Sequence, residues 1–493
     1  MAVSTARPRS LSVTRTDERW VSLLVRAANS PELLAAIALG CLYFLLMSGH
    51  LHSVDGLIMY RDARALVYDH SLRFNPPLLW GGPITSSKYG IGLPLLYVPG
   101  LIFWSWLRPY SPAGFTDFYN WGQFYADPLY TVAAAPVHAI VTAATAYLIA
   151  RFCRALGASN AVALWGVLLY GIGSPALVYA RGDFSQPLTG LCWTIALYAA
   201  WRYRQSANTS PLVVCAIAVG YAVLTRPVEG SLVLPAVLFL LYNATPPWRA
   251  WLTVLAGYGV AVLITVFINA AKYGSPLKTG YGNESWTTPL PLGLAGALIS
   301  PGRGLLWSFP ALILVPFGIR QFWHSPARPA ALALIGLSVV QLLNVAVWDI
   351  WRGGWTWGLR LFVPALPLLA IVAACGIPAL APRLRFLLPA LLLTLGLIWA
   401  IPAVITDLLG GYAGTYDGTR GSFRLSAYPP FGAWTFFKHW RAVSPTDQNA
   451  LDILWLRAAR GSHNISLLLI PCLGLLLTAC VARVYLLLRQ RPS

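Results

Sequence analysis

Stretches of apolar residues recur along almost the whole chain, from Pro31 to Leu488. A helix of about 20 apolar residues crosses the hydrocarbon core of a bilayer, so each stretch is a candidate transmembrane helix. The candidates are residues 31–48, 128–150, 161–180, 186–203, 211–225, 228–243, 250–271, 303–320, 329–348, 360–380, 385–405 and 464–488. The pattern predicts an all-α integral membrane protein with about 12 transmembrane helices (11–13) in a single domain.

The composition excludes a soluble enzyme that is merely anchored to a membrane. Of the 493 residues, 57% are hydrophobic and 10% are charged, whereas about 25% of the residues in a soluble domain are charged. The formal net charge of +19 does not indicate a nucleic-acid partner, because the basic residues flank the apolar stretches, as the positive-inside rule requires. The seven cysteines lie in or beside apolar stretches, so we expect neither a disulfide framework nor a CxxC metal site.

The distribution of charge predicts the orientation in the membrane. With a cytoplasmic N-terminus, 17 of the 35 Lys and Arg residues lie inside with three acids, and 18 lie outside with 13 acids. The inside is therefore the more positive face, as expected. The prediction is a basic cytoplasmic leader at 1–30, a polytopic membrane domain at 31–488 and a cytoplasmic tail at 489–493, so both termini are cytoplasmic. The extracytoplasmic loops are then 49–127, 272–302, 349–359 and 406–463.

The first of these loops is predicted to contain helices that lie in the membrane interface. Residues 57–69 have helical spacing, and the apolar run 91–107 is interrupted by Pro94, Pro99 and Gly100, which is more typical of an interfacial or re-entrant helix than of a span. These segments and the other long loops put most of the polar residues on one face. We therefore expect the chemistry of the protein to take place at that face.

Two charged residues of the first loop are candidates for a site. Asp55 follows the first span almost directly, and its position alone suits the N-cap of an interfacial helix as well as a catalytic carboxylate. Lys88 precedes Gly90 and Gly92 at the start of the second interfacial helix. An ammonium group beside accessible backbone amides at a helix start is a good phosphate site.

Further polar clusters fall on the same face, where charge close to hydrocarbon is costly and is usually functional or paired. A terminal charge that reaches the interface, or a local ion pair, explains each charge taken singly. Tryptophans such as Trp355 and Trp357 are typical of an interfacial belt, but with arginines and glycines between them they also suit a sugar-stacking platform. The clusters are Arg181 to Pro187, Thr225 to Glu229, Asn269 to Gly282, Ser300 to Gly304 and Asp349 to Arg360.

His50 and His52 with Asp55 loosely resemble a metal triad. Polar residues at a helix exit are a commoner explanation, so we expect no metal ligands. No cofactor is required, although use of a divalent metal stays open.

Seven short motifs, in order along the chain, resemble those of the C-type glycosyltransferase superfold, in particular the family of protein mannosyltransferases and lipid A aminoarabinose transferases. The motifs are Val54-Asp55-Gly56 with Tyr60; Ser87-Lys88-Tyr89-Gly90-Ile91-Gly92; Asp183-Phe184-Ser185-Gln186-Pro187; Leu224-Thr225-Arg226-Pro227; Tyr273-Gly274-Ser275-Pro276 with Thr279-Gly280-Tyr281; Ser300-Pro301-Gly302-Arg303-Gly304; and Gly353-Gly354-Trp355-Thr356-Trp357-Gly358-Leu359-Arg360. The resemblance implies a polyprenyl-phosphate sugar donor, an early catalytic Asp in the first extracytoplasmic loop and a bacterial inner or plasma membrane.

The chain also departs from that family. Many members have an acidic pair soon after the first span, whereas here Asp55 is followed by Gly56. Relatives open the second interfacial segment with Lys-Pro-Pro, but this chain has Lys88-Tyr89-Gly90. Residues 406–463 are also compact for the family. These departures concern the acceptor more than the donor.

The resemblance predicts inverting transfer of a sugar to an extracytoplasmic lipid, glycan or protein acceptor. A polyprenyl phosphate is a good leaving group, so the reaction needs cations and one general base, for which we nominate Asp55. The residues expected to bind the donor phosphate are Lys88, Arg226, Arg303 and Arg352. Those expected to bind sugar or acceptor are Tyr60, Tyr89, Asp183, Tyr281, Trp355, Trp357 and Arg360. The alternative is a multi-pass transporter or a flippase of lipid-linked sugars, which predicts charges near mid-span.

Overall fold

The computed structural model of the chain describes residues 29–74, 78–79, 83–107, 109, 129–206, 208–242, 247–282, 284–406, 418–432, 439–443, 450–456 and 464–489. The predicted cytoplasmic leader, apart from its last two residues, lies outside these ranges. Most of the predicted tail and large parts of the loop predicted at 406–463 also lie outside them.

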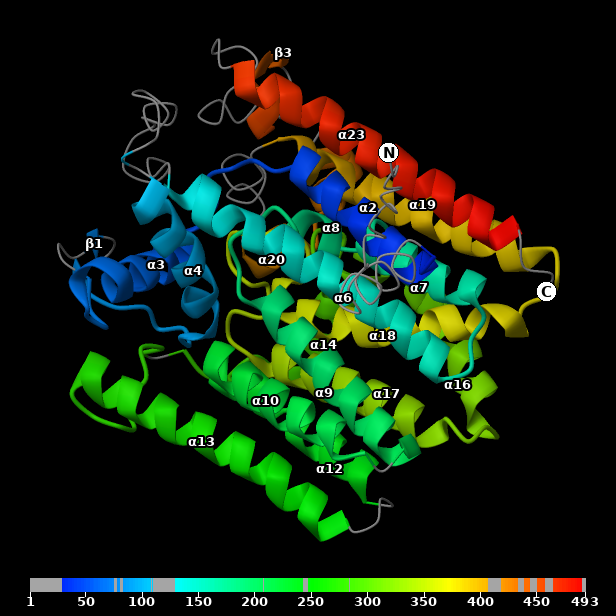
Figure 1. The fold of residues 1–493 in the computed structure, drawn as a ribbon, viewed down its shortest axis with the longest axis horizontal. Coiled ribbons are helices and arrows are strands. Elements are labelled where there is room, and N and C mark those ends of the chain that lie inside the picture. Colours follow the sequence, from blue (N-terminus) through cyan, green and yellow to red (C-terminus); the bar gives the residue numbers. More distant parts are fainter. Residues whose placement is uncertain are drawn as a thin grey trace, which may run out of the picture.

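The described chain is a bundle of α-helices (Figure 1). The longer helices are α2 (Pro31–Leu45), α4 (Gly92–Leu107), α6 (Ala135–Ala155), α7 (Asn160–Gly171), α9 (Gln186–Ser206), α10 (Thr209–Thr225), α12 (Val233–Leu241), α13 (Pro247–Tyr273), α14 (Leu290–Ile299), α16 (Val315–Trp323), α17 (Arg328–Val347), α18 (Leu366–Gly376), α19 (Leu384–Ile405) and α23 (Asn464–Arg489). Short helices connect them: α8 (Ala176–Tyr179), α11 (Pro227–Ser231), α15 (Leu305–Ser308), α20 (Thr419–Ser422) and α21 (Pro429–Gly432).

Six helical segments of the described chain are long and apolar enough to cross a membrane, so the protein is an integral, multi-pass membrane protein. They are Tyr130–Ala155, Pro247–Tyr273, Arg328–Val347, Arg360–Ala379, Leu384–Ile405 and Leu469–Arg489. Every predicted span is helical over most of its length, but several of these helices are short or interrupted, so the count of about 12 stays a prediction. The span predicted at 303–320 is broken at Pro310, because a proline lacks the backbone N–H that an unbroken helix needs.

Glycines allow close helix contacts beside the site. A Cβ atom on Gly220 of α10 would lie 2.9 Å from the carbonyl oxygen of Gly257 in α13, and one on Gly257 would lie 2.5 Å from that of Ala216. Small residues let membrane helices approach closely. These contacts fix α13 against α10, and both helices contribute to the cavity described below.

Helix α3 (Val54–Arg64) begins a few residues after α2 and continues into a π-helical turn at Ala65–Asp69. The side chain of Ser53 caps α3 by accepting a hydrogen bond from the backbone N–H of Gly56. Helices α3 and α4 lie together at one end of the bundle, next to the short antiparallel pair β1 (Leu78–Leu79) and β2 (Pro83–Ile84) (Figure 1). Their location in a membrane interface stays a prediction.

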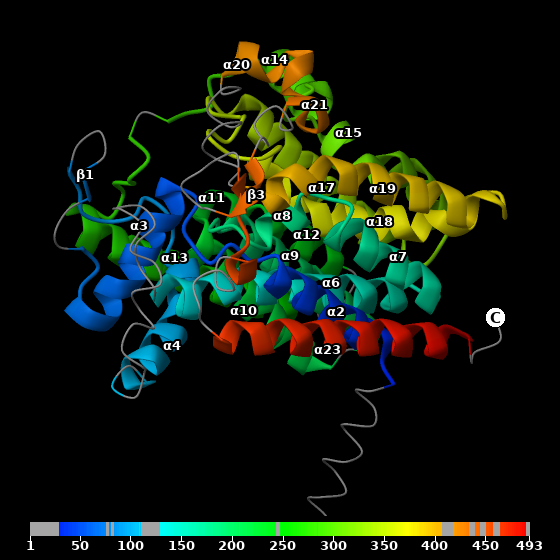
Figure 2. The same cartoon turned by 90° about the horizontal axis from the view of Figure 1, so that it is seen from above.

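The C-terminal part of the chain returns to the first loop. Helix α23 packs along α2, and the strands β3 (His439–Val443) and β4 (Ala450–Leu451) precede it (Figure 2). The backbone N–H of Leu454 donates to the carbonyl oxygen of Met47 at 2.9 Å. This contact joins residues 450–456 to the segment that enters α3.

Candidate active site

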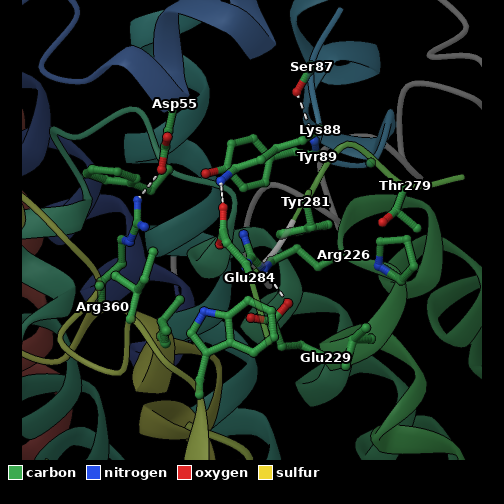
Figure 3. A pocket seen from close by; sticks show the side chains of 18 of the residues that line it. Asp55, Ser87, Lys88, Tyr89, Arg226, Glu229, Thr279, Tyr281, Glu284 and Arg360 are labelled. Carbon is green, nitrogen blue, oxygen red and sulfur yellow. Dashed lines mark hydrogen bonds and ion pairs between the residues drawn. The ribbon is translucent and has the colours of Figure 1, made fainter. Parts of the chain in front are cut away.

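A cavity of about 950 Å³ opens where α3, the loop before α4 and the ends of α10, α13 and α17 meet (Figure 3). Its walls combine charged residues at helix ends with apolar residues from two membrane-length helices. Residues that line it include His52, Ser53, Asp55, Lys88, Tyr89, Phe184, Arg226, Glu229, Thr265, Ile268, Asn269, Lys272, Tyr281, Glu284, Trp286, Asn344, Val345, Trp348, Trp355 and Arg360. Seven of the predicted site residues are therefore brought together, although they are spread over some 300 residues of sequence.

Asp55 lies in the first turn of α3 and projects into the cavity (Figure 3). One Nη atom of Arg360 donates to its Oδ2 at 2.5 Å. Burial alone would raise the pKa of Asp55. The positive charge of Arg360, hydrogen bonds to Tyr89 and Arg360 and the charge of Lys88 outweigh burial and hold the pKa below its ordinary value. At neutral pH, Asp55 is a carboxylate that can accept a proton.

Lys88 lies across the cavity in the loop before α4. Its ammonium group forms an ion pair with Glu284 and lies 5.5 Å and 5.3 Å from the ring centroids of Tyr89 and Tyr281. Burial raises the pKa of Tyr281 to about 12, so that phenol stays neutral at physiological pH. The ammonium group is held by one carboxylate and two aromatic faces.

Arg226 is the third cation of the cavity. It stands at the break between α10 and α11, where Pro227 begins the new helix, and it forms an ion pair with Glu229. Its guanidinium carbon lies 5.4 Å from the ring centroid of Tyr89. Each of Lys88, Arg226 and Arg360 thus has a carboxylate partner in the cavity, and the three surround Tyr89.

Aromatic side chains form another wall. The ring of Trp348 meets that of Trp286 at 5.1 Å and that of Tyr281 at 6.2 Å between centroids. Trp355 is 55% exposed and follows two glycines with φ of +80° and +71°, a backbone conformation that side chains disfavour. The wall offers faces on which a sugar ring can stack.

Five predicted site residues do not line this cavity. Tyr60 packs edge-on against Tyr97 and Tyr130, with centroids 6.2 Å and 5.3 Å away. Trp357 packs on Trp399 at 5.6 Å. The remaining three are Asp183, Arg303 and Arg352.

The two arginines among these five make structural contacts. Arg303 is buried and donates to the backbone carbonyl oxygens of Gly354 and Thr356, so it fixes the loop that presents Trp355. Arg352 donates to the Thr419 hydroxyl at 3.2 Å.

The contacts of Asp183 are directed toward the start of α3. It accepts hydrogen bonds from the backbone N–H groups of His52 and Ser53, each at 2.8 Å, and from the Ser53 hydroxyl at 2.9 Å. Burial raises the pKa of Asp183, although the charge of His52 and these hydrogen bonds act against that rise. Its carboxylate therefore lies behind α3, not on the cavity surface.

Sequence reasoning did not nominate Glu284, Glu229, Phe184, Trp286 or Trp348, all of which line the cavity. For Glu284 a signal existed, since it is the one acid in the loop predicted at 272–302. The sequence does not show that Glu284 pairs with Lys88, because the two residues are more than 190 positions apart.

The two histidines after the first span meet Asp452, not Asp55. In the part of the chain that the structure describes, His50, His52 and Asp452 are the group whose side chains are close enough to share a metal ion. His50 Nε2 is 2.9 Å from one carboxylate oxygen of Asp452, and Arg181 donates to the other at 2.9 Å. Because Arg181 already balances the charge of Asp452, we interpret the cluster as a buried ion-pair network.

Solved structures share this architecture. ArnT from Cupriavidus metallidurans bound to undecaprenyl phosphate matches with a TM-score of 0.52 and 14% identity, over 95% of this chain and 77% of that chain. Its apo state matches with a TM-score of 0.51 and 15% identity over the same shares. The chain has the C-type glycosyltransferase fold. The resemblance inferred from the motifs is thereby confirmed.

The other comparisons gave the following results. The family described as dolichyl-phosphate-mannose-protein mannosyltransferase matches residues 130–271, which run from before α6 to near the end of α13. An oligosaccharyltransferase from Archaeoglobus fulgidus in the apo form matches with a TM-score of 0.47 and 13% identity, over 84% of this chain and 58% of that chain. No curated protein sequence matches the chain.

Proposed function

We propose that this protein is an inverting glycosyltransferase that moves a sugar from a polyprenyl-phosphate donor to an extracytoplasmic lipid, glycan or protein acceptor. The observation that supports this best is the arrangement of Asp55 with Lys88, Arg226 and Arg360 around one cavity. The cavity therefore combines an ionised base with cations for a phosphate leaving group.

In the proposed reaction, an acceptor hydroxyl attacks the anomeric carbon on the side opposite the phosphate. The new carbon–oxygen bond forms as the bond to the phosphate oxygen breaks, the hydroxyl proton passes to Asp55, and polyprenyl phosphate leaves as an anion. The leaving group needs no general acid, because the neighbouring cations stabilise its charge. One carboxylate is sufficient, unlike the pair on which most glycoside hydrolases depend.

Arg360 links phosphate binding to the strength of the base. Its charge is the main influence that lowers the pKa of Asp55 against the effect of burial. A donor phosphate that attracts Arg360 weakens its pairing with Asp55. Asp55 then becomes a stronger base at the moment when the donor is present.

The walls of the cavity suit a lipid-linked donor. Thr265, Ile268 and Asn269 come from α13, and Asn344 and Val345 come from α17. Both helices are long and apolar enough to cross a membrane. A donor whose tail stays in the bilayer can reach the cavity between them, and the relative bound to undecaprenyl phosphate supports this class of ligand.

The alternative of a transporter or flippase is less well supported. It predicts charged groups near the middle of spanning helices. The charged residues of the cavity instead lie at helix ends or in loops. Asp55 is at the start of α3, Arg226 is between α10 and α11, and Arg360 is at the start of its helical segment.

Reconstitution tests the proposal. The purified protein in lipid nanodiscs is supplied with polyprenyl phosphates carrying different radiolabelled sugars, and release of free polyprenyl phosphate is measured. In parallel, lipid-linked sugars and envelope glycans of cells with and without the gene are compared by mass spectrometry. We expect one donor to be consumed by the wild type and to accumulate in the deletion strain. If no donor is consumed and no lipid-linked sugar changes in abundance, the protein is not such a transferase.

A further inference from the structure

The buried segment Asp183-Phe184-Ser185 contacts the start of α3, which carries Asp55, and two arginines of the cavity. It lies between α8 and α9, and Asp183 and Ser185 are almost completely inaccessible to solvent. We infer that this tripeptide positions the reacting groups, and that Asp183 in particular is a positioning residue for Asp55, not a ligand of sugar or acceptor. Only the kinetic tests of this inference rest on the proposed function.

Asp183 determines where α3 begins. Its Oδ2 accepts hydrogen bonds from two successive backbone N–H groups, those of His52 and Ser53, and its Oδ1 accepts one from the Ser53 hydroxyl. The same hydroxyl caps α3 through the N–H of Gly56. Asp55 lies within this turn, so the carboxylate of Asp183 fixes the position of Asp55 without touching the cavity.

Gly56 leaves the space that the Asp183 side chain occupies beside α3. A Cβ atom at position 56 would lie 2.2 Å from both Cγ and Oδ2 of Asp183, which is far inside contact distance. Any side chain there would displace Asp183. Where many members of the family have a second acid directly after the first, this chain has Gly56, and the carboxylate of Asp183 packs against it.

Phe184 and Ser185 extend the contacts to the cations. The guanidinium carbon of Arg360, the partner of Asp55, lies 4.6 Å from the ring centroid of Phe184, which is cation–π geometry. The Ser185 hydroxyl accepts a hydrogen bond from Arg226 at 3.3 Å. Three consecutive residues therefore hold the base, its guanidinium partner and a candidate phosphate-binding cation in one frame.

The test compares two substitutions at position 183. Asp183→Asn removes the charge but keeps one oxygen that can accept from both backbone N–H groups, and its amide can donate to the Ser53 hydroxyl. Asp183→Ala leaves all three donors of the first loop without their acceptor. We expect kcat to fall about 10²-fold in the alanine variant, as displacement of a reacting group by about 1 Å can do. In the asparagine variant kcat should stay within about tenfold of wild type, and the donor KM should be unchanged in both.

The same comparison at Asp55 provides the contrast, because a general base loses its function with either substitution. Ser53→Ala is a second variant that removes one contact from the loop side, in case Asp183→Ala does not fold, and it should lower kcat without changing the donor KM. Thr194→Ala is the matched control. It removes a buried side-chain hydrogen bond from α9, which follows the tripeptide, and should leave kcat unchanged.

Hydrogen–deuterium exchange gives a readout that does not depend on transfer activity. Peptides covering residues 49–60 should exchange faster in Asp183→Ala and close to wild type in Asp183→Asn and Thr194→Ala. Either of two results overturns the inference. One is an Asp183→Asn variant that exchanges normally but is as inactive as Asp183→Ala. The other is a raised donor KM at normal kcat in the Asp183 variants. If the wild type transfers no sugar, the proposed function fails, and the exchange data still decide whether Asp183 fixes the loop.

Discussion

Replacing Glu284 with glutamine should tighten binding of the lipid donor. In the cavity without a donor, Glu284 is the ion-pair partner of Lys88, and a donor phosphate has to compete with it for the ammonium group. Glutamine has nearly the same shape but no charge. The substitution therefore removes the competitor while the two aromatic contacts of Lys88 remain.

The size of the effect follows from the exposure of the pair. The side chains of Lys88 and Glu284 are 26% and 22% exposed, so water and salt partly screen their attraction. Exposed ion pairs contribute about 0.2–1 kcal/mol, and the upper end suits a pair that is three-quarters covered. Since about 1.4 kcal/mol is tenfold in an equilibrium constant, the donor KM should fall about fivefold, and a kcat limited by chemistry should not rise.

Initial rates over a range of donor concentrations, with the protein in nanodiscs, measure this change. Glu229→Gln is the comparison, because the Arg226–Glu229 pair is more deeply buried. Its loss should lower thermal stability more, since it leaves a buried guanidinium without its carboxylate. A donor KM that is unchanged or raised in Glu284→Gln would refute the reasoning, because Lys88 would then not be the group that meets the phosphate.

Three further predictions concern the base and the orientation. Asp55→Asn should lower kcat by about 10²–10⁴-fold in the transfer assay, and wild-type rates would show that Asp55 is not the general base. The pKa of Asp55 is lowered, so activity should be lost only as the pH falls through that low value. Arg360→Met removes the charge that lowers the pKa, so the acidic limb of the pH–rate profile should move to higher pH. An unmoved limb would contradict the role of Arg360. In intact cells, an impermeant thiol reagent should label a cysteine at position 278 and not one at 204; the reverse pattern would overturn the predicted orientation.

The fold class could be predicted because one constraint dominates it. A backbone that crosses hydrocarbon has to satisfy its own hydrogen bonds, so each long apolar run has to be helical. Even 91–107 is helical in spite of Pro99, as α4. The lengths were harder to predict, because Pro310 and Pro316 divide one apolar run into three short pieces, and hydropathy does not register such breaks.

Site residues were predictable where their position relative to a predicted helix already indicates their position in the fold. Asp55 and Arg226 stand at the ends of helices and Lys88 stands in the loop before α4, and helix ends on one face are brought near each other by the bundle. Arg303 shows where this reasoning stops. A charged residue at a helix end looks the same in sequence whether it faces a cavity or, as Arg303 does, the carbonyl oxygens of a neighbouring loop.

The pairing of Lys88, Arg226 and Arg360 with carboxylates should affect turnover. An unpaired charge in so covered a place is costly, and the carboxylates of Asp55, Glu229 and Glu284 remove that cost when no phosphate is bound. Donor binding is then an exchange of one anion for another, which limits affinity. The same exchange assists product release, because polyprenyl phosphate is also an anion and the carboxylates compete with it for the cations. Tighter donor binding in Glu284→Gln should therefore come with tighter binding of the product. Glu284 thus weakens donor binding but speeds release of polyprenyl phosphate, which favours turnover.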